Sequence, residues 1–111
     1  MGYIPDLVQA VIGPHARELK KRGMRVIANA GGVNPHECAN AVLKAASAAG
    51  LAKGELRVAV VDGDDLLPRV EEVRAGGFTD IDSRSPFPQQ TITSMNAYLG
   101  CTHFFTHLPR R

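Results

Sequence analysis

The sequence predicts an α/β fold: a small three-layer βαβα unit with a short parallel sheet that forms part of a larger domain. Two short segments are expected to be buried strands: residues 24–28, with Val26 and Ile27 at the centre, and residues 56–61. Val58–Val61 are apolar on both faces, as a strand of a parallel sheet covered by helices is. A glycine-containing loop follows each segment and leads into a stretch with apolar residues at helical spacing. The order strand, helix, strand, helix predicts a right-handed crossover.

An amphipathic helix is expected before the first strand. Apolar residues recur at helical spacing over residues 4–12 and again at Leu19. Gly13 and Pro14 interrupt this stripe, so a kink or two short helices are expected, because proline removes a helical hydrogen bond and clashes with the preceding turn. Gly23 is expected to end the segment in a left-handed conformation.

The clearest helix start follows the first strand, at Asn34-Pro35-His36-Glu37. Asn34 is expected to be the N-cap, Pro35 suits the first helical position, and Glu37 can close a capping box. The helix is predicted to end at Gly50. Its inner face consists almost entirely of small side chains: Cys38, Val42, Ala45, Ala46 and Ala49.

A third helix is predicted after the second strand. Apolar residues mark it over residues 66–73, and the glycine pair 76–77 is expected to end it. Pro68 is tolerated because it falls in the first turn. Farther along, Thr91–Thr93 is a candidate for a short strand.

Composition and charge narrow the classes of function. The 111 residues include 13 Lys and Arg and 11 Asp and Glu, a formal charge of +2. This even spread lacks the concentrated basic face of a nucleic-acid-binding protein. No apolar stretch approaches the ~20 residues that span a bilayer, and the two cysteines do not form a disulfide framework. We therefore expect a cytoplasmic protein without nucleic-acid or membrane partners.

The loop after the first strand is the first candidate for ligand binding, with Asn29, Gly31, Gly32 and Asn34 as candidate residues. A helix N-terminus presents unpaired N–H groups to a phosphate or carboxylate, and glycines let a ligand approach the main chain. The loop matches neither the dinucleotide-binding glycine pattern nor a P-loop. The competing interpretation is a tight turn that needs glycine for its backbone alone.

The loop after the second strand is the second candidate, with Asp62, Asp64 and Asp65. Ligands of open α/β sheets lie beyond the carboxyl ends of strands, so both loops are expected at one rim. Clustered carboxylates can hold Mg²⁺ or bind ribose hydroxyls, although Asp64 is equally well explained as a helix N-cap. Asn96, near the end of the chain, is a further candidate pocket residue.

Other reactive side chains support no catalytic assignment. His36 could serve as an acid or base, but a histidine in a first helical turn is usually a surface residue. Cys38 is expected to be a small buried apolar group. His103 and His107 have a helical spacing without the accompanying glutamate of a metal motif. We therefore assign no catalytic residue, no metal and no cofactor.

Four separate stretches resemble one family. They are residues 2–6 (GYIPD), 26–35 (VIANAGGVNP), 60–67 (VVDGDDLL) and 93–100 (TSMNAYLG). Together they resemble the core domain of the acyclic terpene utilisation (AtuA-like) family. The resemblance covers residues 2–100, and residues 1–100 are interpreted as a partial domain. Residues 101–111 do not match the family and are interpreted as a tail. An absent upstream part and this tail suggest a gene fragment.

The resemblance implies a role in the breakdown of acyclic terpenes such as citronellol and geraniol, without naming a reaction. It favours a small-molecule ligand, an acyl thioester or carboxylate, at the two loops. Two alternatives remain: a non-catalytic interaction or oligomerisation module, because exposed sheet edges invite pairing with another chain, and an inactive truncated fragment. A homo-oligomer is compatible with the first alternative.

Overall fold

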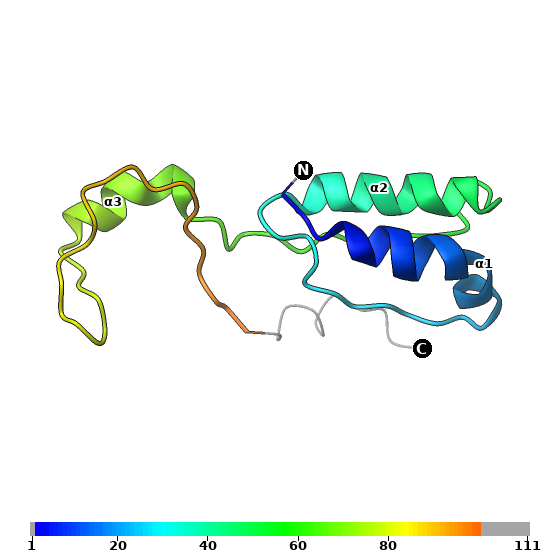
Figure 1. The fold of residues 1–111 in the computed structure, drawn as a ribbon, viewed down its shortest axis with the longest axis horizontal. Coiled ribbons are helices and arrows are strands. Elements are labelled where there is room, and N and C mark those ends of the chain that lie inside the picture. The colour runs from blue at the N-terminus through cyan, green and yellow to red at the C-terminus, as the bar shows by residue number, and fades with distance from the viewer. Residues whose placement is uncertain (1, 101–111) are drawn as a thin grey trace. The chain divides into compact units, whose positions relative to one another are not determined.

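The structure is a computed structural model that describes residues 2–100, and the predicted tail 101–111, with His103 and His107, lies outside the described residues. The chain divides into two compact units, Met1–Val60 and Val61–Arg111. The first unit holds the π-helical turn η1 (Leu7–Ile12), α1 (Gly13–Lys21) and α2 (Pro35–Ala48), and the second holds the 3-10 turn η2 (Leu67–Arg69) and α3 (Val70–Ala75) (Figure 1).

The predicted α/β fold is wrong for residues 2–100, which form helices and irregular segments without any β-strand. The predicted strands 24–28 and 56–61 join no ladder, and Thr91–Thr93 is not a strand either. Within the described residues, β-type pairing is limited to isolated antiparallel bridges, which join Asp65 to Asn96 and Thr79 to Pro86.

The predicted strands failed because an apolar pattern does not supply a pairing partner. A strand satisfies its backbone groups only through a neighbouring strand, and the described residues provide none for these segments. Their side chains consequently remain at the surface: Ile27 is 53% exposed and Val58 is 38% exposed. Without a sheet, the parallel arrangement and its right-handed crossover are lost as well.

The first helix is continuous through the predicted break at Gly13 and Pro14. Its N-terminal part, η1, is wound as a π-helix in which the Gly13 N–H donates to the carbonyl of Val8, five residues earlier. Pro14 lies in the first turn of α1. A wider turn directly before a proline gives the ring room against the preceding carbonyls, so the chain changes helix type instead of breaking.

The core of the first unit lies between the first helix and α2. The two helices lie side by side and run in the same direction (Figure 1). Val8 and Ile12 of η1 pack with Val42 of α2, and each is less than a tenth exposed. Burying such side chains stabilises a fold by about 1.5–3 kcal/mol each. Cys38 and Ala46 are also buried on α2, which confirms the small inner face predicted for this helix.

Both helices of this unit end at the predicted glycines. Gly23 has a φ of +60°, and its N–H donates to the carbonyl of Lys20 at 3.0 Å while Met24 N–H donates to Leu19 at 2.9 Å. Gly50, with a φ of +89°, makes the equivalent pair of bonds at the end of α2. This double closure is the Schellman motif, which satisfies carbonyls that a helix end otherwise leaves open.

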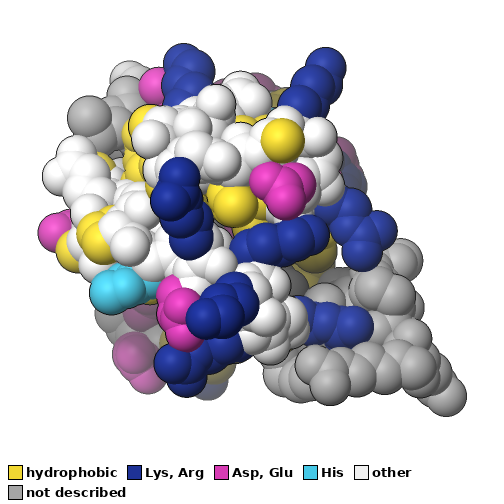
Figure 2. All heavy atoms as spheres, turned by 90° about the vertical axis from the view of Figure 1, so that its right-hand side faces the viewer, with side chains coloured by type: hydrophobic (Ala, Val, Ile, Leu, Met, Phe, Trp, Pro, Cys, Tyr) yellow, Lys and Arg dark blue, Asp and Glu magenta, His cyan; other side chains and the backbone are white. Residues whose placement is uncertain are grey.

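Cations gather at the end of α1. Lys20 and Lys21 occupy its last turn, where the helix dipole favours positive charge. Arg17 reaches across to α2, and its Nε donates to the carbonyl of Ala49 at 2.6 Å. Figure 2 views the right-hand side of Figure 1, where α1 and α2 end, and shows Lys and Arg side chains distributed with acidic and apolar side chains between them.

The second unit has a shorter helix than expected. The six-residue α3 begins only after the 3-10 turn that contains Pro68, and Gly76 caps its end. Beyond α3, Asp80 closes a loop: its carboxylate accepts from the Ser83 N–H at 2.7 Å and the Ser83 hydroxyl at 2.8 Å. These bonds stabilise the ionised form and lower the pKa of Asp80.

The helices of residues 2–100 are too short or too polar to cross a lipid bilayer.

Replacing Ile12 tests the helix-to-helix core. Ile12→Ala leaves a void beside Val42 and is expected to lower the free energy of unfolding by about 2–4 kcal/mol. Val11→Ala, at a neighbouring side chain that is 43% exposed, is expected to change it by about 0.5 kcal/mol or less. Urea unfolding followed by the helical circular dichroism signal measures both. Similar losses for the two variants would contradict the assigned core.

Candidate functional site

The glycine loop of the first unit folds against the start of the chain. The Ile4 N–H donates to the carbonyl of Ala30 at 2.8 Å, and the Val33 N–H donates to the carbonyl of Gly2 at 2.9 Å. Ala30 is only 7% exposed, whereas Asn29 and Gly32 are exposed. The loop is therefore held by main-chain bonds to residues 2–4.

Steric contacts explain why both positions of this loop, 31 and 32, are glycine. Gly32 has a φ of +54°, and a Cβ built on it would lie 2.4 Å from the carbonyl oxygen of Gly2. A Cβ on Gly31 would lie 2.8 Å from the Cβ of Pro35. The close approach that glycine permits here is thus made by the chain itself, which supports the interpretation of a turn that needs glycine. A ligand at this loop stays a prediction.

The start of α2 is capped as predicted. The Glu37 N–H donates to Asn34 Oδ1 at 3.1 Å, and Asn34 Nδ2 donates to Glu37 Oε2 at 2.9 Å. The backbone N–H of Asn34 bonds to Gly31 instead, so the reciprocal contact runs between side chains. The helix N-terminus consequently carries a carboxylate of its own. His36 is exposed in the same turn.

The second unit brings together three of the predicted site residues. Asn96 Nδ2 donates to Asp64 Oδ2 at 3.2 Å. Two main-chain bonds support this contact: Leu66 N–H to the Met95 carbonyl and Ala97 N–H to the Asp64 carbonyl, both at 2.8 Å. Asp65 and Asn96 form the antiparallel bridge between these segments. Positions about thirty residues apart in sequence, each in a stretch that carries the family resemblance, thus meet.

Asp65 rather than Asp64 makes the local turn bond. Asp65 Oδ1 accepts from the Leu67 N–H at 2.9 Å, which is an Asx-turn ahead of η2. The N-cap role considered for Asp64 is not found, because its carboxylate contacts Asn96 and the helical residues begin farther along. Asp62 precedes this contact and is exposed. We call Asp64, Asp65 and Asn96 the acidic contact.

The acidic contact offers hydrogen-bond acceptors at the surface. All three of its residues are exposed, and a carboxylate accepts several hydrogen bonds at once. No group of three or more potential metal-binding His, Cys, Asp or Glu side chains occurs within residues 2–100. The arrangement is therefore suited to hydroxyl or amide N–H donors of a ligand.

The loops 29–34 and 62–65 belong to different units, and each is described by itself. Their expected position at one rim was inferred from a parallel sheet, which residues 2–100 lack. A common site for both loops has therefore lost its structural rationale, although each loop keeps its own candidate residues.

Two hollows lie elsewhere. One, of about 410 Å³, lies between the first helix and the end of α2 and is lined mainly by small apolar residues, including Gly13, Ala45 and Ala49. The other, of about 430 Å³, is open to solvent and lies at the loop that Asp80 closes. Neither hollow is lined by a predicted site residue.

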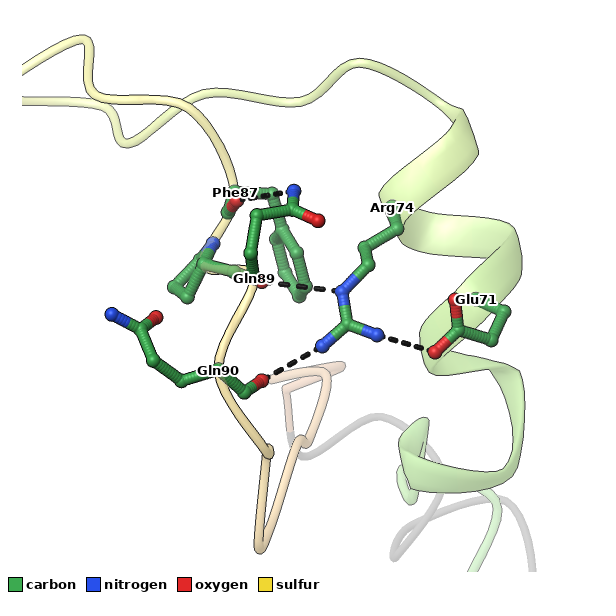
Figure 3. A network of polar contacts seen from close by, with 6 residues as sticks. Glu71, Arg74, Phe87, Gln89 and Gln90 are labelled. Atoms are coloured by element: carbon green, nitrogen blue, oxygen red, sulfur yellow. Dashed lines mark hydrogen bonds and ion pairs between the residues drawn. The ribbon is translucent and has the colours of Figure 1, made fainter.

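Arg74 of α3 makes a polar network that the sequence did not reveal. Its Nε donates to the carbonyl of Pro88 at 3.2 Å and its Nη2 to the carbonyl of Gln90 at 2.8 Å. The third nitrogen forms an ion pair with Glu71 (Figure 3). The side chain is only 19% exposed. Arg74 thus holds the 88–90 segment against α3.

A second ion pair of the same spacing provides a contrast. Arg69 and Glu72 bond through two nitrogens of the guanidinium. The hydrogen bond to Glu72 and its negative charge raise the pKa of Arg69. The hydrogen bond from Arg69 and its positive charge lower the pKa of Glu72. Both side chains are more than half exposed, so water screens the pair and its net effect on stability is small.

The fold and the two loops define a small helical protein that presents polar hydrogen-bonding groups at its surface. Residues 1–109 match the protein family described as acyclic terpene utilisation family protein AtuA. The chain belongs to this family, which confirms the resemblance carried by the four sequence stretches. No curated protein and no solved structure matches the chain.

Replacing glycines tests why the loop after residue 28 needs them. Gly32→Ala meets both a left-handed backbone and the Gly2 carbonyl, whereas Gly23→Ala, at nearly the same φ, has nothing within 4 Å of the new Cβ. We expect a loss of about 1–2 kcal/mol for Gly23→Ala and a clearly larger loss for Gly32→Ala, measured by urea unfolding. Equal losses would show that the contact with residue 2 is unimportant.

Exchanging arginines tests the network of Figure 3. Arg74→Lys cannot bond two carbonyls and a carboxylate together and is expected to destabilise the second unit by about 1.5–3 kcal/mol. Arg69→Lys, at an exposed pair, is expected to change stability by about 0.5 kcal/mol or less. Hydrogen exchange of amides around residue 90 distinguishes the two. Unchanged exchange in Arg74→Lys would contradict the clamping role.

Proposed function

We propose that this chain acts in acyclic terpene utilisation, in the cytoplasm, by binding a small-molecule intermediate carried as an acyl thioester or carboxylate. Membership of the family, over residues 1–109, supports the pathway. The acidic contact supports ligand binding, because it joins two family stretches through hydrogen bonds that leave carboxylate oxygens at the surface.

The chemistry of the acidic contact suggests which part of the ligand it recognises. Carboxylates repel an anionic head group but accept hydrogen bonds from hydroxyl and amide groups. Asp64 and Asp65 would therefore bind the hydroxyl or amide groups of a thioester carrier, such as the ribose hydroxyls of coenzyme A. The single observation that carries this proposal is the bond between Asn96 Nδ2 and Asp64 Oδ2 at 3.2 Å.

The glycine loop of the first unit is a separate candidate site, for an anionic ligand of its own. Asn29 is exposed there, and Gly31 and Asn34 are half-buried at the start of α2. Main-chain N–H groups at a helix start favour a carboxylate or thioester oxygen. Glu37 opposes this at close range, because its carboxylate already faces Asn34, so any such contact is expected to be weaker than that at the acidic contact.

A ligand panel with charge-neutral variants tests the proposal. Coenzyme A, a branched-chain acyl-coenzyme A, the free branched carboxylate and geraniol are each titrated against the whole chain, and the melting temperature and calorimetric affinity are measured. The acyl-coenzyme A is expected to bind and to raise the melting temperature. At a hundredfold excess over Kd it adds about 2.7 kcal/mol to the free energy of unfolding. Asp64→Asn keeps an acceptor for Asn96 but removes the charge and is expected to weaken binding about tenfold.

Asp82→Asn provides the matched control, because Asp82 is another exposed aspartate of the second unit. It is expected to bind as the unchanged chain does. The proposal fails if none of the four ligands binds, or if Asp64→Asn and Asp82→Asn weaken binding equally. Binding of geraniol alone would support the pathway and refute the thioester.

A further inference from the structure

The open hollow at the loop that Asp80 closes combines apolar and charged lining. Its volume of about 430 Å³ falls within the range of roughly 300–1,000 Å³ that is typical of ligand pockets. Pro86, Phe87 and Pro88 supply the apolar lining, and hydroxyl side chains and the carboxylate of Asp80 supply the polar lining. Apolar walls with a few polar groups are the usual composition of a small-molecule site.

Hydrogen bonds within the chain fix the walls of this hollow. The Asp80 N–H donates to the Ser85 carbonyl at 2.8 Å, and the Phe87 N–H donates to a carbonyl across the loop at 3.2 Å. Arg74 of α3 holds the carbonyl of Pro88 at 3.2 Å (Figure 3). Walls that are fixed in advance lose little conformational freedom when a ligand binds.

The carboxylate of Asp80 uses one of its two oxygens to close the loop. Oδ1 accepts from the Asp82 N–H at 3.1 Å, from the Ser83 N–H at 2.7 Å and from the Ser83 hydroxyl at 2.8 Å. Within residues 2–100, Oδ2 accepts no hydrogen bond and Asp80 forms no ion pair. The bonds from Ser83 and Asp82 lower the pKa of Asp80, so its carboxylate is ionised at neutral pH. A charged oxygen therefore remains for a donor from outside the chain.

The charges around the hollow select the kind of ligand. No Lys or Arg of residues 2–100 lines it. A carboxylate forms its strongest hydrogen bonds with a cationic donor, and the face of an aromatic ring such as that of Phe87 attracts a cation. An anion, in contrast, is repelled by Asp80.

We propose that this hollow binds a small organic ammonium. Its charge is held by Asp80 Oδ2 and the ring of Phe87, and its apolar body lies against Pro86 and Pro88. The site shares no residue with the acidic contact, so this proposal is independent of the proposed function.

Three probes of one shape test the proposal: cyclohexylammonium, cyclohexanol and cyclohexanecarboxylate. Each is titrated against the isotope-labelled whole chain, and the amide shifts of residues 79–88 are measured by NMR. Cyclohexylammonium is expected to shift these amides with a Kd of about 1 mM. Cyclohexanol is expected to bind about tenfold more weakly, because it lacks the charge, and the carboxylate is expected not to bind.

Asp80→Asn separates the two oxygens of the carboxylate. The amide keeps Oδ1 for the three bonds of the loop and replaces the charged Oδ2 with an N–H donor. Cyclohexylammonium is expected to bind this variant about tenfold more weakly. Asp82→Asn is the matched control, because it removes the same charge from the same loop at a side chain that does not line the hollow. It is expected to change the affinity about twofold or less.

Phe87→Leu tests the aromatic face, since leucine keeps the wall apolar but has no π-system. Cyclohexylammonium is expected to bind it about threefold more weakly, with amide shifts outside residues 79–88 unchanged. The proposal is overturned if cyclohexylammonium leaves the amides of residues 79–88 unshifted, or if cyclohexanol binds as tightly. Equal weakening by Asp80→Asn and Asp82→Asn, or an unchanged affinity in Phe87→Leu, also overturns it.

Discussion

The contact of Val8 and Ile12 with Val42 determines the arrangement of the first unit. It places two helices side by side in the same direction, so the chain must return along their whole length to connect them. That return is the extended connection after Gly23, and its far end meets residues 2–4 at the glycine loop. The core, the connection and the loop are thus consequences of one apolar contact.

Signals that act within a few residues were read correctly from the sequence. Asn34 caps α2, and Gly23 and Gly50 end their helices in left-handed conformations. Each of these features depends on bonds between residues at most five positions apart, so the local sequence contains all the information required. Cys38 and Val42 are buried as predicted because helical spacing alone determines which side chains share a face.

Features that depend on distant partners were not predicted in the same way. An apolar run such as 24–28 has the pattern of a strand, but a sheet forms only where another strand lies alongside. Arg74 binds carbonyls 14 and 16 residues away, and no sequence pattern marks a main-chain acceptor. Asp64 and Asn96 were named as candidates, whereas their mutual bond became evident only in three dimensions.

The π-helical turn before Pro14 has a consequence for how this family can vary in length. A π-turn contains one residue more than the α-turn it replaces, so η1 can be regarded as an α-helix with a single insertion. Losing one residue there would restore regular α winding and would leave the residues after it nearly in phase, because the wider turn takes up the extra residue by itself. Ala16, now 1% exposed, would stay buried, and Arg17 would keep its reach to the end of α2. Relatives without the extra residue are therefore expected to need no compensating changes on either helix.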